Sequence, residues 1–203
     1  MVTLIFLILL LLNVSYSVQG KEKKMSRKEQ FFHAVSSGDH DLVEDLIVNH
    51  LVDVNMKNKF QETPLHVSAL SNQKSKGEIL LLLLQNGADP NAQTEFKYRG
   101  HEILVNRTPL HWYSHSCDHV GIRLLVLYGA DERLRTEEGQ SSIEIIENII
   151  THSKKKLPEC ELALEYLKLS FEFREKNKKL AEADFANLPI EDAGPNDTES
   201  NEL

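Results

Sequence analysis

Apolar residues in this chain gather in runs of helical length that end in a glycine turn. The two clearest runs are "KGEILLLLLQNGADPNAQ" at 76–93 and "HVGIRLLVLYGADERLR" at 119–135. Each predicts an apolar helix followed by Gly-Ala-Asp, in which Gly87 or Gly129 can take the left-handed conformation that ends a helix. One helical unit cannot bury so many leucines alone, so we expect each unit to pack against a neighbour on either side.

The same tetrapeptide, Thr-Pro-Leu-His, precedes both runs and begins at Thr63 and at Thr108. Threonine can cap the free N–H groups of a new helix, and proline fits the first helical position, where its missing N–H costs nothing. The tetrapeptide therefore predicts a helix start. We expect the rings of His66 and His111 to bridge the cap of their own unit and a neighbouring backbone carbonyl.

The two tetrapeptides are 45 residues apart, which is twelve more than a repeat period of about 33 residues. Comparison of the two units places three of the extra residues near "NQKSK", between the helices of one unit, and nine in "TEFKYRGHEILVN" at 94–106, between the units. Fainter copies of the same rhythm occur at 31–55 and 139–146. Two clear units between two degenerate ones are typical of a solenoid, because terminal units face water.

From about residue 27 to residue 170 the chain resembles the ankyrin-repeat family, whose period is about 33 residues. The resemblance implies an all-α solenoid of stacked helix–turn–helix units with β-turn or loop fingers, divided at about 27–60, 61–106, 107–138 and 139–170. The family usually carries two alanines after the tetrapeptide, whereas this chain has Ser68–Ala69 and Tyr113–Ser114. Because tyrosine is far larger than alanine, we expect the third unit to splay or to aim the Tyr113 ring outward.

A long helix is predicted after the repeats, from Pro158 to Ala186. Its apolar positions recur every three or four residues, so the first half is expected to dock on the last repeat and 171–186 to extend beyond it. The docking positions would be Leu162, Tyr166, Leu169 and Phe173. The tail at 187–203 is rich in proline, glycine and acids, and we expect it to be disordered.

Both ends of the chain carry address signals. The apolar run at 4–12 has the length of a signal-peptide core, so 1–20 is predicted as a signal peptide, cleaved after small residues. No Lys or Arg precedes the run, and "KEKKMSRK" follows it. If the run stayed uncleaved, this order would anchor a cytosolic adaptor to the membrane. The last residues, "SNEL", resemble a lumenal retrieval signal, so we expect the endoplasmic reticulum lumen or secretion.

The net charge of −8 argues against nucleic-acid binding, which needs a basic face. The two cysteines, Cys117 and Cys160, fall on the same edge of adjacent layers, so a disulfide is expected in an oxidising lumen, and two free buried thiols are the alternative. Two sequons begin at Asn106 and Asn196. Asn196 lies in the tail, open to glycosylation, whereas the first sequon uses the hydroxyl of Thr108, which folding could bury.

One cluster could hold zinc: His111, His115, Cys117 and His119. The repeat pattern weighs against a metal site, because His111 points into the turn and His119 lies beyond the helix. No phosphate loop or activated nucleophile is visible, so we predict neither an enzyme nor a cofactor.

The residues expected to bind a partner lie in the enlarged loop at 94–106. Aromatic residues and arginine are the usual anchors of protein interfaces, and this loop carries Phe96, Tyr98, Arg99 and His101, with Trp112 nearby. The alternative is a hairpin that folds back on the solenoid with Phe96 and Ile103 buried. We therefore expect a monomeric, non-enzymatic module that binds another protein through its inter-repeat loops and concave helix face.

Overall fold

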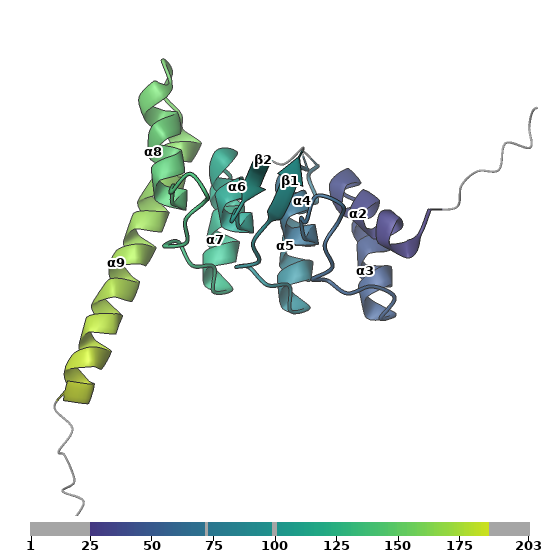
Figure 1. Ribbon diagram of the computed structural model, residues 1–203, viewed down its shortest axis with the longest axis horizontal. Coiled ribbons are helices and arrows are strands. Elements are labelled where there is room, and N and C mark those ends of the chain that lie inside the picture. The colour runs from purple at the N-terminus through teal and green to yellow at the C-terminus, as the bar shows by residue number, and fades with distance from the viewer. Residues whose placement is uncertain (1–24, 72, 99–100, 187–203) are drawn as a thin grey trace, which may run out of the picture.

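The computed structural model describes residues 25–71, 73–98 and 101–186, and within them the backbone alone at 96–104 and 180–186. Helical hairpins stack side by side in two rows (Figure 1). Contacts run along each row, from helix to equivalent helix of the next unit. One row holds α2 (Arg27–Ser37), α4 (Pro64–Ala69), α6 (Pro109–His115) and α8 (Ser142–His152). The other holds α3 (His40–Val48), α5 (Lys76–Gln85), α7 (His119–Leu127) and α9 (Pro158–Ala186).

The expected helical solenoid is thereby confirmed, with one addition. The inserted segment forms a two-stranded antiparallel sheet, β1 (Glu95–Tyr98) and β2 (His101–Val105). The last helix, α9, is continuous across residue 170, so the fourth unit and the predicted extension share one helix. The predicted signal peptide and the acidic tail, with its retrieval signal, lie outside the described residues.

The tetrapeptides start helices α4 and α6, as predicted. The ring Nδ1 of His66 accepts the backbone N–H of Thr63 at 3.2 Å, and its Nε2 donates to the carbonyl oxygen of Arg107 at 2.9 Å. His111 repeats the arrangement, with the N–H of Thr108 at 3.0 Å and the carbonyl oxygen of Leu134 at 3.0 Å. The expected bridge is confirmed, and each histidine ties its own helix start to the turn of the following unit.

The expectation of an outward Tyr113 ring is wrong, because Tyr113 is fully buried. The space comes from Gly121, on α7. A Cβ atom at residue 121 would lie 2.1 Å from the Tyr113 ring, far inside van der Waals contact. Because Gly121 has no side chain, the Tyr113 ring fits into the space beside it. This explains how a tyrosine can replace the alanine usual at this position of the repeat.

Helix α9 docks on α7 and α8, but of the four predicted residues only Tyr166 takes part. The buried positions are Cys160, Ala163 and Leu167, and Tyr166 is half-buried. The other three residues of the predicted face are exposed: Leu162 by 48%, Leu169 by 59% and Phe173 by 67%. Apolar spacing marks a helix face but does not say which face docks, and here the smaller side chains of Cys160 and Ala163 let the helices approach.

Within the described residues no helix is both long enough and apolar enough to cross a membrane.

Candidate partner-binding surface

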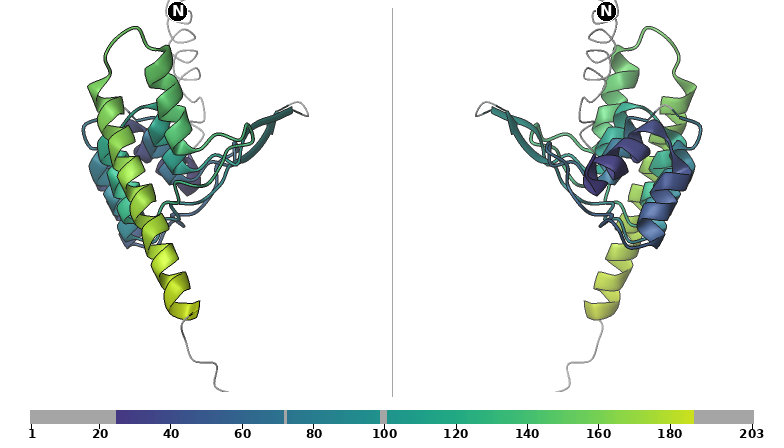
Figure 2. Two further views of the ribbon diagram at one scale, coloured as in Figure 1. Left: turned by 90° about the vertical axis from the view of Figure 1, so that its left-hand side faces the viewer. Right: turned by 90° about the vertical axis from the view of Figure 1, so that its right-hand side faces the viewer.

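The hairpin of β1 and β2 projects from the α4–α6 side of the solenoid (Figure 2). Its base is fixed by Thr94, which is fully buried. The N–H of Thr94 donates to the carbonyl oxygen of Arg107 at 3.0 Å, and the N–H of Asn106 donates to the carbonyl oxygen of Thr94 at 2.8 Å. On the other side, the N–H of Glu137 donates to the carbonyl oxygen of Val105 at 3.3 Å. The hairpin is therefore anchored to the turns of two successive units.

The strand register pairs Tyr98 with His101 and Glu95 with Val105. Phe96, Tyr98 and His101 thus lie on the strands, but their side chains are outside the described part of the structure, and Arg99 lies outside it altogether. Partner binding by these four residues stays a prediction. The alternative is a hairpin with buried Phe96 and Ile103 side chains. It also stays untested, because the side chains at 96–104 are outside the described part of the structure.

An apolar hollow of about 310 Å³ lies at the foot of the hairpin, between α4 and α6. Trp112, the fifth predicted binding residue, forms one wall, and its ring meets the ring of His66 edge to face, with centroids 6.1 Å apart. Leu70, at the end of α4, is 59% exposed on the opposite wall. The full lining is Ala69, Leu70, Arg107, Trp112, His115 and Ser116.

Arg107 closes one side of the hollow, and its guanidinium is held on two sides. Its Nη1 donates to Nε2 of His115 at 2.9 Å, and its Nη2 lies 3.0 Å from Oε1 of Glu138. Burial, and then the positive charge of Arg107, lower the pKa of His115, so this ring is neutral and accepts the hydrogen bond. Because the arginine is already paired with a carboxylate, the hollow presents an apolar surface without an unpaired charge.

Sequence reasoning did not place Leu70, Arg107 or His115 on this surface, and it considered His115 only as a zinc ligand. The available signal was positional: Leu70 and His115 occupy the same place in successive units, at the exposed end of the first helix. A repeat places equivalent residues on one surface, so unlike side chains at such a position indicate a surface that varies from unit to unit.

The zinc-type cluster is dispersed by the fold. The ring of His111 is used at the helix cap, and that of His115 pairs with Arg107. Nδ1 of His119 lies 2.6 Å from Oε2 of Glu159. Within the described residues no group of three or more His, Cys, Asp or Glu side chains is arranged to hold a metal ion.

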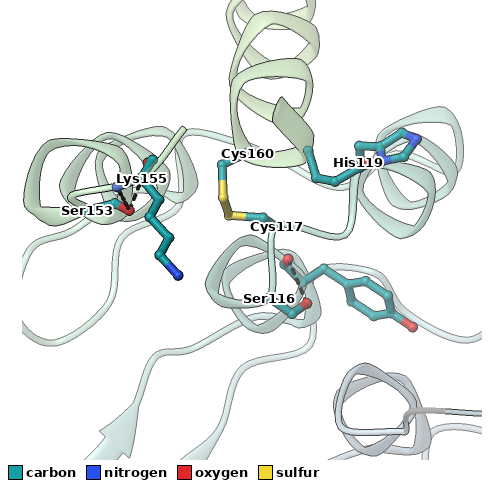
Figure 3. Close-up of a disulfide and its surroundings, with 8 residues drawn as sticks. Ser116, Cys117, His119, Ser153, Lys155 and Cys160 are labelled. Atoms are coloured by element: carbon teal, nitrogen blue, oxygen red, sulfur yellow. Dashed lines mark hydrogen bonds and ion pairs between the residues drawn. A yellow bond between two sulfur atoms is a disulfide. The ribbon is translucent and has the colours of Figure 1, made fainter. Parts of the chain in front are cut away.

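Cys117 and Cys160 are joined by a disulfide, with Cα atoms 4.7 Å apart (Figure 3). Cys117 lies in the turn between α6 and α7, and Cys160 in the first turn of α9. The bond therefore ties the last helix to the third unit, just after the C-terminal end of the α6 helix that carries Trp112.

The first sequon is partly closed by folding. The side-chain amide of Asn106 donates to Oε2 of Glu137 at 3.4 Å, and Thr108 is only 1% exposed. A hydroxyl so buried is not available in the folded chain, so glycosylation at Asn106 would have to precede folding. The second sequon, at Asn196, lies outside the described residues.

Comparisons with known proteins agree with this architecture. Residues 31–136 match the family model of ankyrin repeats, in three copies. Alpha-latrocrustotoxin-Lt1a of Latrodectus tredecimguttatus is 38% identical over 71 residues, which are 35% of this chain and 5% of the toxin. Palmitoyltransferase Hip14 of Drosophila melanogaster is 37% identical over 94 residues, 46% of this chain and 13% of that protein. The chain thus spans a small part of the length of each of these relatives.

Proposed function

Because this chain belongs to the ankyrin-repeat family, which makes it a protein-interaction module, we propose that it binds a partner protein in the secretory pathway and catalyses no reaction. The partner contacts the hairpin of β1 and β2 and the hollow at its foot. The proposal assigns the chemistry of recognition to this surface and leaves the rest of the solenoid as its rigid support.

The observation that carries the proposal is the apolar hollow beside Leu70 and Trp112. Folding alone does not need a leucine that is 59% exposed at the end of α4. A concave apolar site with an aromatic wall, next to a projecting hairpin, has the features of an interface centre, where one or two buried anchors supply most of the binding energy. The neutral His115 and the paired Arg107 limit the desolvation cost of covering this site.

The disulfide supports the secretory location. Bonds of this kind persist in the endoplasmic reticulum lumen and outside the cell, and are rare in the reducing cytosol. The bond of Cys117 to Cys160 therefore favours a cleaved signal at 1–20 over the alternative of an uncleaved membrane anchor with a cytosolic solenoid. We include in this proposal that the "SNEL" terminus retains the protein in the endoplasmic reticulum lumen. Secretion from the cell is the alternative location.

The binding surface is tested with two matched leucine variants. Leu70→Asp places a charge in the hollow, and Leu127→Asp places the same charge on α7, where Leu127 is 65% exposed. Affinity purification of the tagged full chain from lumenal fractions should recover a partner with the Leu127 variant and lose it with the Leu70 variant. Equal recovery by both variants would reject the hollow as the binding site.

The location is tested separately. Mass spectrometry of the purified protein should find a new N-terminus, left by removal of the signal peptide predicted at 1–20. Free-thiol labelling should find both cysteines bonded. An intact N-terminus with two reactive thiols would support the anchored cytosolic adaptor instead.

A further inference from the structure

Helix α9 carries an apolar stripe that the described part of the structure leaves mostly uncovered. Leu162, Leu169 and Phe173 are 48%, 59% and 67% exposed, and the half-buried Tyr166 lies between them. The four positions are spaced four, three and four residues apart, which is the spacing of a coiled-coil seam. Along an α-helix this spacing puts them on one face, within about 60° of one another.

Most of the stripe faces away from the docked side of α9. The docked residues, Cys160, Ala163 and Leu167, lie on a neighbouring face, centred roughly 120° around the helix from the stripe. Figure 1 shows α9 closing the C-terminal end of the two rows, so its outer side has no further repeat to meet. The helix is held in place by the disulfide at its start and by the ion pair of Arg174 with Glu132, 3.4 Å apart. A pre-ordered helix of this kind loses little conformational entropy when it binds.

The charges beside the stripe are divided along its length. Glu165 and Glu172 lie beside the stripe on one side of the helix, and two lysines follow Phe173: Lys176 at the next position of the seam and Lys179 on the same side as the glutamates. All four are exposed, and none forms an ion pair with another described residue. The helix therefore presents an apolar seam with two glutamates along one flank and two lysines beyond its C-terminal end.

We propose that this stripe is a homodimer interface, in which α9 packs antiparallel against α9 of a second copy of this chain. Antiparallel packing brings the flank that carries the charges against the same flank of the second copy, so Glu165 faces Lys176 and Lys179 across the interface, twice by symmetry. A parallel pair would set this flank against Ser170 and Asn177, which carry no charge. The glutamates and lysines of one α9 helix are thus complementary to those of a second, antiparallel copy of α9.

One antiparallel register aligns the apolar seam and also pairs the opposite charges. It places Leu169 of one copy beside Phe173 of the other. In this register the two copies of Glu172 approach each other near the two-fold axis, and their repulsion weakens the pair. The two solenoids then extend in opposite directions from the paired helices, with both hollows free. The proposed dimer differs from the monomer expected from the sequence, and the following experiment decides between the two.

Sedimentation equilibrium of the protein purified in its processed form measures the association. The seam is short, so the dimer should be of the weak class and should form within a dilution series that reaches about 200 µM. Phe173→Asp should weaken association at least about tenfold, and Leu127→Asp, an equally exposed position on α7, should leave it unchanged. Glu172→Gln should strengthen association, because it removes the repulsion at the axis.

A charge exchange tests the orientation. Glu165→Lys should weaken the dimer about three- to tenfold, and adding Lys176→Glu and Lys179→Glu should restore it. Circular dichroism of each variant verifies that the exposed substitutions leave the fold intact. A wild-type protein that stays monomeric through the series overturns the proposal, whether or not the stripe then binds vesicles or another protein. A dimer that is indifferent to Phe173→Asp overturns it as well.

Discussion

The hydroxyl of Tyr113 lies 2.9 Å from Oγ of Ser68, and the two residues occupy the same position in successive repeats. Ser68 donates its own proton to the carbonyl oxygen of Leu65 at 2.8 Å, so it accepts from the tyrosine. Burial raises the pKa of Tyr113, which keeps the phenol protonated as the donor. A large residue in one layer is thus matched by a small residue in the layer before it and by Gly121 in its own unit.

Gly121→Ala should destabilise the protein by about 1–3 kcal/mol, because the new methyl group overlaps the Tyr113 ring in a packed interior. The free energy of unfolding, from urea titration followed by circular dichroism, measures the loss. Tyr113→Phe should cost about 1 kcal/mol, because it removes one buried hydrogen bond while the ring stays in place.

A double-mutant cycle separates this overlap from a general intolerance of α7. With Tyr113→Ala as the background, Gly121→Ala should cost little, since the ring it would meet is absent. If Gly121→Ala costs the same in both backgrounds, Tyr113 and Gly121 are not the paired fit that the structure shows.

Stability should fall as the pH is lowered from about 6.5 toward 4. Burial lowers the pKa of His66 and of His111 from 6.5 to about 4, because each ring is enclosed between its helix cap and a carbonyl oxygen. In this range the unfolded chain binds protons that the folded chain does not, so each histidine can cost up to about 3 kcal/mol. Melting temperatures measured from pH 7.5 to 5 should change little at first and decrease steadily below about pH 6.5.

Histidine variants provide the control for this pH dependence. His66→Asn should reduce the slope of stability against pH, and His33→Asn, at an exposed position on α2, should not. Measurements stop at pH 5 so that the protonation of carboxylates does not contribute to the slope. Glu144, for example, has its pKa held below 4.5, first by the backbone N–H of Ser141, and its stabilising effect is lost only under more acidic conditions. An unchanged slope in His66→Asn would refute the role of this ring.

The helix starts and the repeat order could be predicted because they depend on local chemistry. Thr108, proline and His111 specify a cap by their own geometry, and the structure reproduces it. Packing between layers could not be predicted in the same way. The fit of Tyr113 depends on Gly121, which lies on another helix, and the docked face of α9 depends on the surface it meets. The hollow was missed for the same reason, because Leu70 and Arg107 become neighbours only when the units stack.

Reduction of the disulfide should lower stability by about 4 kcal/mol, as expected for a bond that spans 43 residues of sequence and restricts the unfolded chain. Melting of the wild-type protein with and without a thiol reductant measures the shift. Limited proteolysis should show earlier cleavage within α9, which Cys160 ties to the third unit. The Cys117→Ser, Cys160→Ser double variant should melt at the lower temperature and ignore the reductant. A wild-type protein that ignores it too would show that the bond is not formed.

The last prediction concerns Glu132, whose side chain is fully buried, and Arg174, its only charged contact among the described residues. Arg174 also donates to the carbonyl oxygen of Ala130 at 3.0 Å, so it links α9 to the turn after α7. Arg174→Ala should cost about 3–5 kcal/mol, because it leaves a buried carboxylate unpaired. Adding Glu132→Gln should recover part of the loss, since the amide carries no charge. Arg133→Ala, which breaks the more exposed pairs with Asp131 and with Glu175 of α9, should cost no more than about 1 kcal/mol. If Arg133→Ala and Arg174→Ala destabilise the protein equally in urea titrations, the buried pair does not hold α9 in place.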